Sequence, residues 1–400
     1  MRRLGRWVAP VAATAVSIAI VGCGASAPTF SSASPSPTPT PTPTPAASGP
    51  GPTSSRPTPD GKIVFYREAG VWPPPEFMID PDGSNEIALQ DDGLLPARRS
   101  PDGRTLLVRR LVNEWIRPAI LDAKDASLVL LDAYPDRQMH LDPVGWSGDG
   151  ARIFVFSGVD AVDPLDIGLY SVRASDGGDL TPVVLSPAGA RDWVSPSPDA
   201  SLLLVNRELG DGTSTLLVRA ADGPTEHRLS TDDMVPVDLE FWGPFDGQGR
   251  ISEAWSPDGR QIAFTVRVIT ADSTGLFIVN PDGTGLRQIV PTSIGAVSAQ
   301  WSPDGSSIAF TSRLRSQPQV WIVGLDGSEP MPLTSDADGS TSVAPIWSPD
   351  GRMLLFERKQ AGHVTLWTMN ADGTAQTQVT KTPLADDYFG GYAWLAAPGG

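Results

Sequence analysis

The sequence is poor in three residue types that often carry chemistry. It has one cysteine, three histidines and only four lysines beside 26 arginines in 400 residues. A single cysteine excludes a disulfide within the chain, so the fold must depend on a hydrophobic core, which a chain of this length can supply. The histidines are His140, His227 and His363, and their wide separation along the chain argues against a shared metal site.

Catalytic signatures are missing as well. The sequence contains no H-E-x-x-H, no G-x-x-x-x-G-K and no G-x-G-x-x-G. The stretch "GWSGDG" misses the G-x-S-x-G nucleophile elbow because Asp149 stands where glycine is needed, and "DADGS" from Asp336 lacks the further ligands of an EF-hand loop. We therefore expect no catalytic residue, no metal and no cofactor, although a pair of carboxylates acting without a motif would escape this search.

The chain is acidic, with a net charge of −16. This balance excludes the basic footprint of a nucleic-acid-binding protein, and it disfavours electrostatic attraction to anionic lipid. Sixteen of the 36 aspartates precede a glycine, so much of the acidity belongs to turns rather than to a ligand site. We expect a monomer that contacts the membrane through a lipid anchor only.

The N-terminus predicts that anchor. Three arginines among the first six residues precede an uncharged, mostly apolar run over 7–22, which has the length of a signal peptide. The run ends in "IVGC", which resembles the lipobox of bacterial lipoproteins, and the resemblance implies cleavage before Cys23 and lipidation of its thiol. We predict a signal peptide over 1–22, a disordered Pro/Thr/Ser-rich linker over 23–57, and anchoring on the extracytoplasmic face of a bacterial cell membrane.

One phrase dominates the rest of the chain. The stretch "WSPDGRQIAFTV", from Trp255 to Val266, returns almost unchanged at Trp301 and at Trp347. Its Ser-Pro-Asp-Gly segment matches a type I turn, in which proline fixes φ at the second position and glycine accepts a positive φ at the end. Apolar residues flank the turn, so the phrase predicts a strand, a tight turn and a second strand.

Seven copies of this turn follow one another. Each is followed by a second strand, a variable loop, a third strand, a second turn that usually reads Asp-Gly, and a short fourth strand. Four short strands per repeat are typical of propeller blades. The aspartates that we assign to the first turn of each repeat are Asp60, Asp102, Asp149, Asp199, Asp258, Asp304 and Asp350.

The two ends of the repeat region complement each other. The first copy has no strand before its turn, whereas the last is followed by "YAWLAAP", whose Trp394 stands where an eighth repeat tryptophan should fall. We predict an all-β fold over 58–397, a seven-bladed propeller of four-stranded blades whose C-terminal strand completes blade 1. Six or eight blades are alternatives, because the fourth repeat is long.

The recurring "WSPDG..IAF" with a later "DG" resembles the WD40-like, or PD40, repeats of TolB-type propellers over about residues 58–397. The resemblance implies the fold more than the function, since similar propellers occur as periplasmic scaffolds, in prolyl-oligopeptidase-like peptidases and as oligogalacturonate lyases. Two features depart from TolB proteins. No obvious extra domain precedes the propeller, and seven blades are predicted where the TolB propeller has six.

Any ligand site should lie where the repeat is broken. The connections from strand two to strand three and from blade to blade vary in length, and both are expected on one face of the ring. The largest insertion, Thr231 to Arg250, holds aromatic residues beside acids, which suits a peptide, glycan or cationic partner, although Phe241 and Trp242 could instead fasten a long loop onto the ring. The candidate ligand face comprises Trp72, Asp160, Asp163, Asp166, Asp232, Asp233, Asp238, Glu240, Phe241, Trp242, Asp386, Asp387 and Tyr388.

Three functions are compatible with these observations. We favour a lipid-anchored binding or scaffolding module for a protein, peptide or glycan partner, without catalysis. The second is a carbohydrate-active or other hydrolytic enzyme with carboxylates in the propeller funnel. The third is a sensory ectodomain that reports to a membrane partner.

Overall fold

The computed structural model describes residues 60–67, 75–89, 94–113, 115–134, 140–157, 168–185, 192–199, 201–208, 214–221, 226–229, 234–236, 255–268, 273–314, 317–335, 337–384 and 391–397. They belong to a compact unit that spans Ser55–Gly400. Every element of this part of the chain is a β-strand, and no helix suited to crossing a membrane occurs among its residues.

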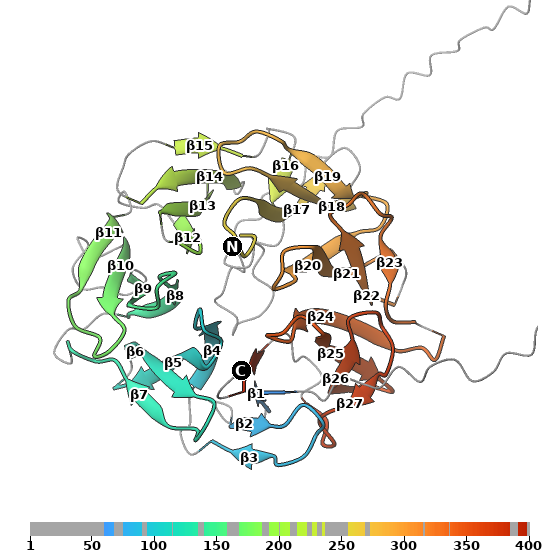
Figure 1. Cartoon of the computed structure of the whole chain (residues 1–400), viewed down its shortest axis with the longest axis horizontal. Coiled ribbons are helices and arrows are strands. Elements are labelled where there is room, and N and C mark those ends of the chain that lie inside the picture. The colour runs from blue at the N-terminus through green and yellow to red at the C-terminus, as the bar shows by residue number, and fades with distance from the viewer. Residues whose placement is uncertain are drawn as a thin grey trace, which may run out of the picture. The chain divides into compact units, whose positions relative to one another are not determined.

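The strands form seven four-stranded sheets arranged as the blades of a ring (Figure 1), which confirms the predicted fold class and blade count. From the innermost strand outward, the first three blades are β28 (Tyr392–Leu395), β1 (Lys62–Tyr66), β2 (Glu76–Ile79), β3 (Ile87–Ala88); β4 (Leu94–Arg99), β5 (Thr105–Val112), β6 (Trp115–Asp122), β7 (Leu128–Leu130); and β8 (Asp142–Trp146), β9 (Arg152–Ser157), β10 (Gly168–Arg173), β11 (Thr181–Leu185).

The remaining four blades follow the same order, and all pairs within the blades are antiparallel. Blades 4 and 5 are β12 (Asp192–Pro196), β13 (Leu202–Glu208), β14 (Ser214–Ala220), β15 (Glu226–Arg228) and β16 (Met234–Pro236), β17 (Ile262–Val268), β18 (Ser273–Val279), β19 (Arg287–Val290). Blades 6 and 7 are β20 (Ala296–Trp301), β21 (Ser307–Ser312), β22 (Gln319–Gly324), β23 (Met331–Pro332) and β24 (Thr341–Trp347), β25 (Met353–Gln360), β26 (His363–Asn370), β27 (Thr377–Gln378).

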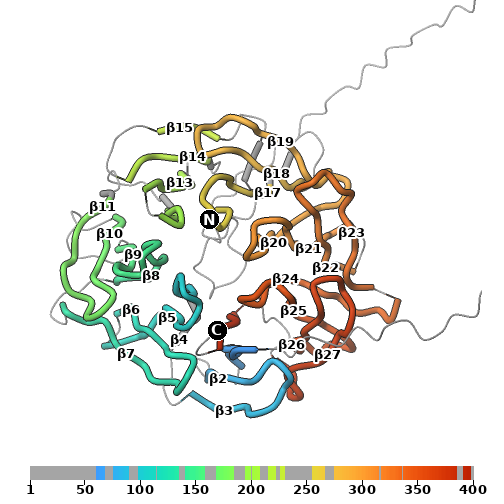
Figure 2. The backbone as a smooth tube through the Cα atoms, viewed as in Figure 1, coloured from blue at the N-terminus to red at the C-terminus, as the bar shows by residue number. Residues whose placement is uncertain are grey.

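Blade 1 is built from both ends of the repeat region. Figure 2 shows the chain passing once around the ring, so that its C-terminal strand β28 returns to β1. Trp394 pairs with Ile63, and the Trp394 indole Nε1 donates a 2.8 Å hydrogen bond to the Asp60 carbonyl oxygen. The predicted closure by the C-terminal strand is therefore confirmed, and β28 gives blade 1 the same four strands as the other blades.

The repeated turn has the same internal bonding in most blades. The Gly259 amide donates to the Ser256 carbonyl at 2.9 Å, and Gly259 has a φ of +71°, a value that strains any other residue. The Asp258 carboxylate accepts hydrogen bonds from the Ser256 hydroxyl and the Arg260 amide. The bond from Ser256 holds the pKa of Asp258 below its usual value. The turn therefore satisfies its own polar groups and keeps its carboxylate ionised.

The hydrophobic core lies between neighbouring blades rather than inside any one of them. On β1, the side chains of Ile63 and Phe65 pack into a cluster with blade 7, whereas Val64 between them packs into a cluster with blade 2. Successive residues of a strand point to opposite faces, so each second strand contributes to two interfaces. A run of apolar residues such as "KIVFY" therefore belongs to a sheet that is covered on both faces.

The long insertion of the fourth repeat differs from its predicted place between two blades. Met234–Pro236 pairs with Val266–Val268 of β17, while Trp255 forms a bridge to Ile262 at the other end of the same strand. Both segments are therefore parts of the innermost strand of blade 5, and 237–254 separates them within that strand. In blade 6 the corresponding strand has a β-bulge at this level, so the insertion occupies a point where the strand pairing is already irregular.

Candidate functional site

The predicted lipidation site and ligand face lie outside the described residues. This holds for Cys23 and for Trp72, Asp160, Asp163, Asp166, Asp232, Asp233, Asp238, Glu240, Phe241, Trp242, Asp386, Asp387 and Tyr388. The described side chains must therefore supply any site that the structure shows. We call the end of the ring with the strand 1–2 turns the turn end, and the end where strand two passes to strand three the loop end.

The repeat tryptophans connect neighbouring blades. The indole Nε1 of Trp347 in blade 7 donates to the Gln300 carbonyl oxygen of blade 6 at 3.1 Å, and Trp255 in blade 5 donates to the Ser195 carbonyl oxygen of blade 4 at 3.3 Å. In blade 2 the equivalent place in the register belongs to Arg99, which donates to the Trp394 carbonyl oxygen at 3.2 Å. The tryptophan of the repeated phrase therefore holds the ring together, a role that turn chemistry alone does not reveal.

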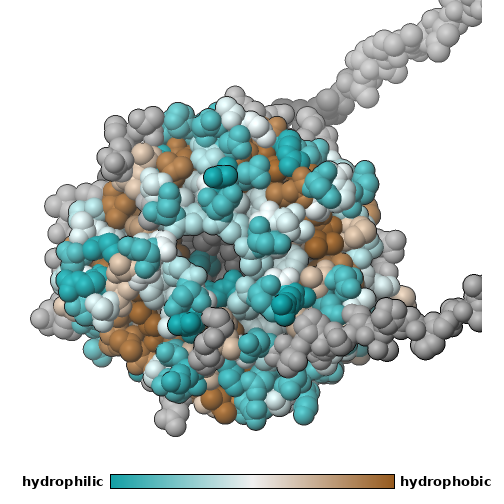
Figure 3. Space-filling view, in the orientation of Figure 1, coloured by the Kyte–Doolittle hydropathy of each residue, from teal (hydrophilic) through white to brown (hydrophobic). Residues whose placement is uncertain are grey.

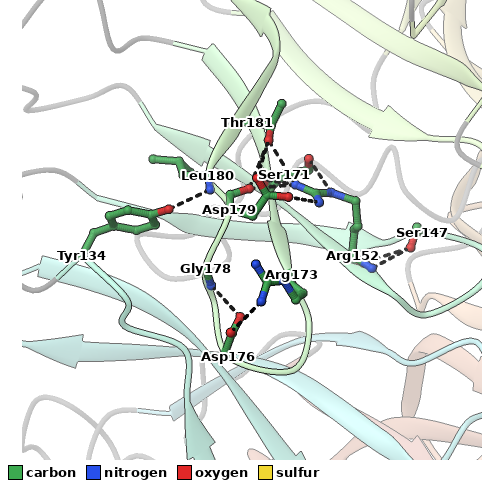
Figure 4. Close-up of polar contacts among 10 residues, drawn as sticks. All are labelled: Tyr134, Ser147, Arg152, Ser171, Arg173, Asp176, Gly178, Asp179, Leu180 and Thr181. Atoms are coloured by element: carbon green, nitrogen blue, oxygen red, sulfur yellow. Dashed lines mark hydrogen bonds and ion pairs between the residues drawn. The ribbon is translucent and has the colours of Figure 1, made fainter.

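The outer turn of blade 3 shows the same use of polar groups for structure (Figure 4). The Tyr134 hydroxyl, from the connection after blade 2, accepts a 2.9 Å hydrogen bond from the Leu180 amide. Arg152 forms an ion pair of 2.7 Å with Asp179, and the Asp176 carboxylate accepts from the Gly178 amide. These side chains fasten blade 3 to itself and to blade 2, so they are poor candidates for ligand contacts.

The innermost strands surround an opening at the centre of the ring (Figure 3). Their half-buried side chains are mostly small or apolar: Val144, Val194, Ala299, Ile346 and Ala393. Among the innermost-strand side chains that the structure describes, the one carboxylate is Asp142 of β8. The described wall therefore lacks the two facing acids that a hydrolase in the funnel would need.

Asp142 belongs to a charged cluster between blades 2 and 3 at the loop end. Both of its carboxylate oxygens accept hydrogen bonds from the Arg109 guanidinium, the one from Nη2 measuring 2.9 Å, and the two side chains are 27% and 9% exposed. Burial raises the pKa of the Asp142 carboxyl, while the charges of Arg109, His140 and Arg98 oppose the rise. A charged pair with a buried cation is costly unless both partners are well bonded. Perturbed carboxylates of this kind are enriched at functional sites.

The hairpin of β5 and β6 carries two more guanidinium groups near this cluster. Arg110 and Arg117 lie directly opposite each other in the register, an arrangement that is unfavourable without neighbouring acids. Arg117 is 2% exposed, and its Nε donates to the Asp132 carboxylate at 3.0 Å. Several arginines of blade 2 therefore lie near the loop end of its β5–β6 hairpin.

No sequence motif pointed to this cluster. Arg109 and Asp142 are far apart in the chain and meet only because consecutive blades pack side by side. One signal was present in the composition, since 94–134 contains seven arginines and lysines against five acids in a chain of net charge −16. A charge count by repeat, rather than over the whole chain, would have singled out blade 2.

The described residues offer no metal site. No group of three or more metal-ligating side chains occurs among them, and their histidines lie in different blades or connections, as the sequence indicated. His140 instead serves blade 2, because its Nδ1 accepts a 3.0 Å hydrogen bond from the Ile116 amide and its ring contacts that of Trp115 at 5.0 Å between centroids. His140 therefore fastens the connection before β8 to the start of β6.

Comparisons with known proteins agree with the fold. Residues 240–387 match the model of the PD40 family, described as the TolB beta propeller domain, whereas no curated protein matches the sequence. TolB from Acinetobacter baumannii is 15% identical with a TM-score of 0.51, over 84% of this chain and 66% of that one.

Two further solved structures resemble the chain at similar levels. An oligogalacturonate lyase from Vibrio parahaemolyticus is 13% identical with a TM-score of 0.54, over 80% of this chain and 86% of that one. The propeller domain of the Trilobed protease from Pyrococcus furiosus is also 13% identical with a TM-score of 0.54, over 80% of this chain and 94% of that one. Identities this low concern the fold alone. The chain is thus a seven-bladed β-propeller with TolB-like PD40 repeats over residues 240–387.

Proposed function

We propose that the protein is a lipid-anchored, extracytoplasmic binding or scaffolding module for a protein, peptide or glycan partner, and that it has no catalytic activity. The observation that carries this proposal is the cluster of Arg109, Asp142, His140 and Trp115 at the loop end, beside the central opening. Arginine and aromatic side chains are enriched at the centres of interfaces, where they combine a large contact area with directed hydrogen bonds. The carboxylates of the repeated turns, in contrast, bond to residues of their own turn.

The anchoring part of the proposal has its own support in the sequence. A signal-peptide pattern ends at the single cysteine, Cys23, and a linker rich in proline and threonine follows. In the native host, replacement of Cys23 by serine should move the protein from the membrane fraction to the soluble extracytoplasmic fraction. Retention of the Cys23→Ser variant in washed membranes would contradict the lipid anchor.

The binding role is tested by site-specific photo-cross-linking in the host. A photoreactive residue at Leu111, exposed at the loop end, should give a defined cross-linked species, whereas the same residue at Asp326, in an outer turn at the turn end, should give none. Mass spectrometry of the product identifies the partner. Equal products from both positions, or none from any loop-end position, would count against a partner site at the loop end.

A further inference from the structure

The outermost strand of each blade is an open sheet edge. Among the described strands, β3, β7, β11, β15, β19, β23 and β27 each pair with one neighbour only. Such an edge can accept a further strand from another chain, and proteins prevent this with charged residues, prolines, bulges or very short edge strands. An outermost strand without these protections is therefore a candidate for binding a partner.

Six of the seven edges carry at least one protection. The strand β15 reads Glu-His-Arg and is exposed throughout, and β19 begins with the exposed Arg287. Proline occurs in β11 and β23, at Pro182 and Pro332, while β3 and β27 are only two residues long. Among the described edges, β7 alone is three residues or longer and contains neither a charged residue nor a proline, since it reads Leu-Val-Leu.

The backbone of β7 has hydrogen-bonding groups on its open side. The Leu131 amide and the Ser127 carbonyl oxygen each bond to β6 at 2.9 Å. Backbone groups alternate in direction along a strand, so Val129 also bonds toward β6, whereas Leu128 and Leu130 direct their N–H and C=O groups outward. No described residue bonds to these outward groups. They match what the backbone of an added strand would supply.

The side chains of β7 present apolar surface beside that backbone. Leu128 and Leu130 are half-buried against the core between blades 1 and 2, whereas Val129 points to the opposite face and is 51% exposed. Val129 pairs with the half-buried Ile120, and hydrophobic residues gather over these outer strands of blade 2 (Figure 3). An added strand would therefore gain backbone hydrogen bonds and apolar contact together.

Charge indicates which strand fits this edge. The turn before β7 carries Asp122 and Asp125 against Lys124, and hydrogen bonding by Ser127 holds the pKa of the exposed Asp125 below its usual value. The whole chain has a net charge of −16. A second copy of the chain would be repelled on approach, whereas a partner with cations beside an apolar strand would be attracted.

We propose that β7 is a docking edge for an extended segment of a partner protein, apolar at its centre and carrying lysine or arginine at its ends, which pairs with Leu128 and Leu130 as a fifth strand of blade 2. This surface lies on the outer rim of the ring. It therefore goes beyond the proposed function, which concerns the cluster at the loop end.

A synthetic peptide tests the proposal on the purified protein. The probe is a capped heptapeptide with lysine at both ends and alternating threonine and valine between them, and it should bind. The same peptide with N-methylated backbone amides should not bind, because the methyl groups block its hydrogen-bonding edges. Replacement of both lysines by glutamate should weaken binding by at least about fivefold.

Two matched substitutions locate the site. Val129→Lys gives β7 the kind of charge that protects other edges, and we expect the affinity to fall by at least about tenfold. Met331→Lys adds the same charge at the equivalent place in blade 6, since Met331 pairs with Ile322 as Val129 pairs with Ile120, and Met331 is 60% exposed. Because Pro332 already protects that edge, the affinity should stay within about twofold.

Hydrogen exchange distinguishes an added strand from contact with side chains alone. The Leu128 and Leu130 amides should exchange more slowly when the peptide is bound, with no change across β23, and circular dichroism establishes that each variant is folded. Absence of binding at about 1 mM peptide, equal binding of the N-methylated peptide, equal losses in the two variants, or protection elsewhere than at β7 would overturn the proposal. So would a Val129-dependent dimer without peptide, because the occupant would then be a second copy.

Discussion

The two ends of the ring use the same residue types for different purposes. At the turn end, Asp258 and its counterparts accept hydrogen bonds from a serine and an amide of their own turn. At the loop end, Asp142 of blade 3 instead binds Arg109 of the neighbouring blade 2. The acidic residues of this chain therefore have two roles. Aspartates that bond within their own turn recur with the sequence repeat and build the fold. An aspartate that bonds to a neighbouring blade occurs outside the repeat pattern and marks a place open to a specific function.

The largest expected effect concerns the packing of turns against one another at the turn end. A Cβ atom on Gly148 would lie 2.0 Å from the Pro198 carbonyl oxygen of the next blade, so the backbone itself would have to move. We expect Gly148→Ala to lower the free energy of unfolding by about 3 kcal/mol in chemical denaturation.

Gly327 provides the matched control for this substitution. It has a positive φ of +90° but no atom within 4 Å of its added Cβ, so Gly327→Ala should cost about 1 kcal/mol. Equal losses of unfolding free energy at both positions would show that packing between neighbouring turns does not contribute to stability.

A smaller effect is expected from the charged pair at the loop end. Asp142→Ala leaves the Arg109 guanidinium buried without its carboxylate, and we expect a loss of about 2 kcal/mol. The double variant Arg109→Met, Asp142→Leu should recover most of that loss, because it removes the unpaired charge as well. Additive losses from the two substitutions would mean that the pair is not coupled.

One substitution should stabilise the protein. Ala126 stands where the matching outer turn of blade 3 has Gly177, and both adopt a positive φ, of 58° and 73°. Because alanine is strained there, Ala126→Gly should raise the free energy of unfolding by about 0.5–1 kcal/mol, net of the greater freedom of glycine in the unfolded chain. An unchanged or lower midpoint of thermal unfolding would show that the strain at Ala126 is negligible.

The smallest expected effect is the loss of stability at low pH. Hydrogen bonding by Ser340, with Arg358 nearby, lowers the pKa of Asp338 from 3.8 to about 2. Since the folded-state pKa lies below the ordinary value, ionised Asp338 contributes stability above pH about 4, and this contribution is lost as the pH falls through about 2. NMR titration of the Asp338 carboxyl carbon should give a midpoint near 2, and the stability difference from Asp338→Asn should vanish below it. A midpoint near 3.8 would contradict the bonding described.

Much of the fold could be predicted from the sequence because its signals are local. Ser-Pro-Asp-Gly fixes a tight turn within four residues, and counting the turns gave seven blades, with Trp394 closing the first. The place of the long insertion was not predictable in the same way. It interrupts a strand between Pro236 and Trp255, and only the pairing of those segments with β17 shows that they belong to one strand.

The candidate site required the assembled ring. Arg109 and Asp142 have no common motif, and they meet only when blades 2 and 3 pack side by side. Sequence reasoning favoured acids and aromatics in long loops, which all lie outside the described residues, and it overlooked the positive charge of one repeat. A cluster built between two regular blades leaves no such signal in the repeat pattern.

The most direct test of the account is photo-cross-linking in the host from one position at each end of the ring. The account predicts a defined product from Leu111 at the loop end and none from Asp326 at the turn end. A product from the turn end alone, or equal products from both ends, would contradict the assignment of structure to the turn end and of recognition to the loop end.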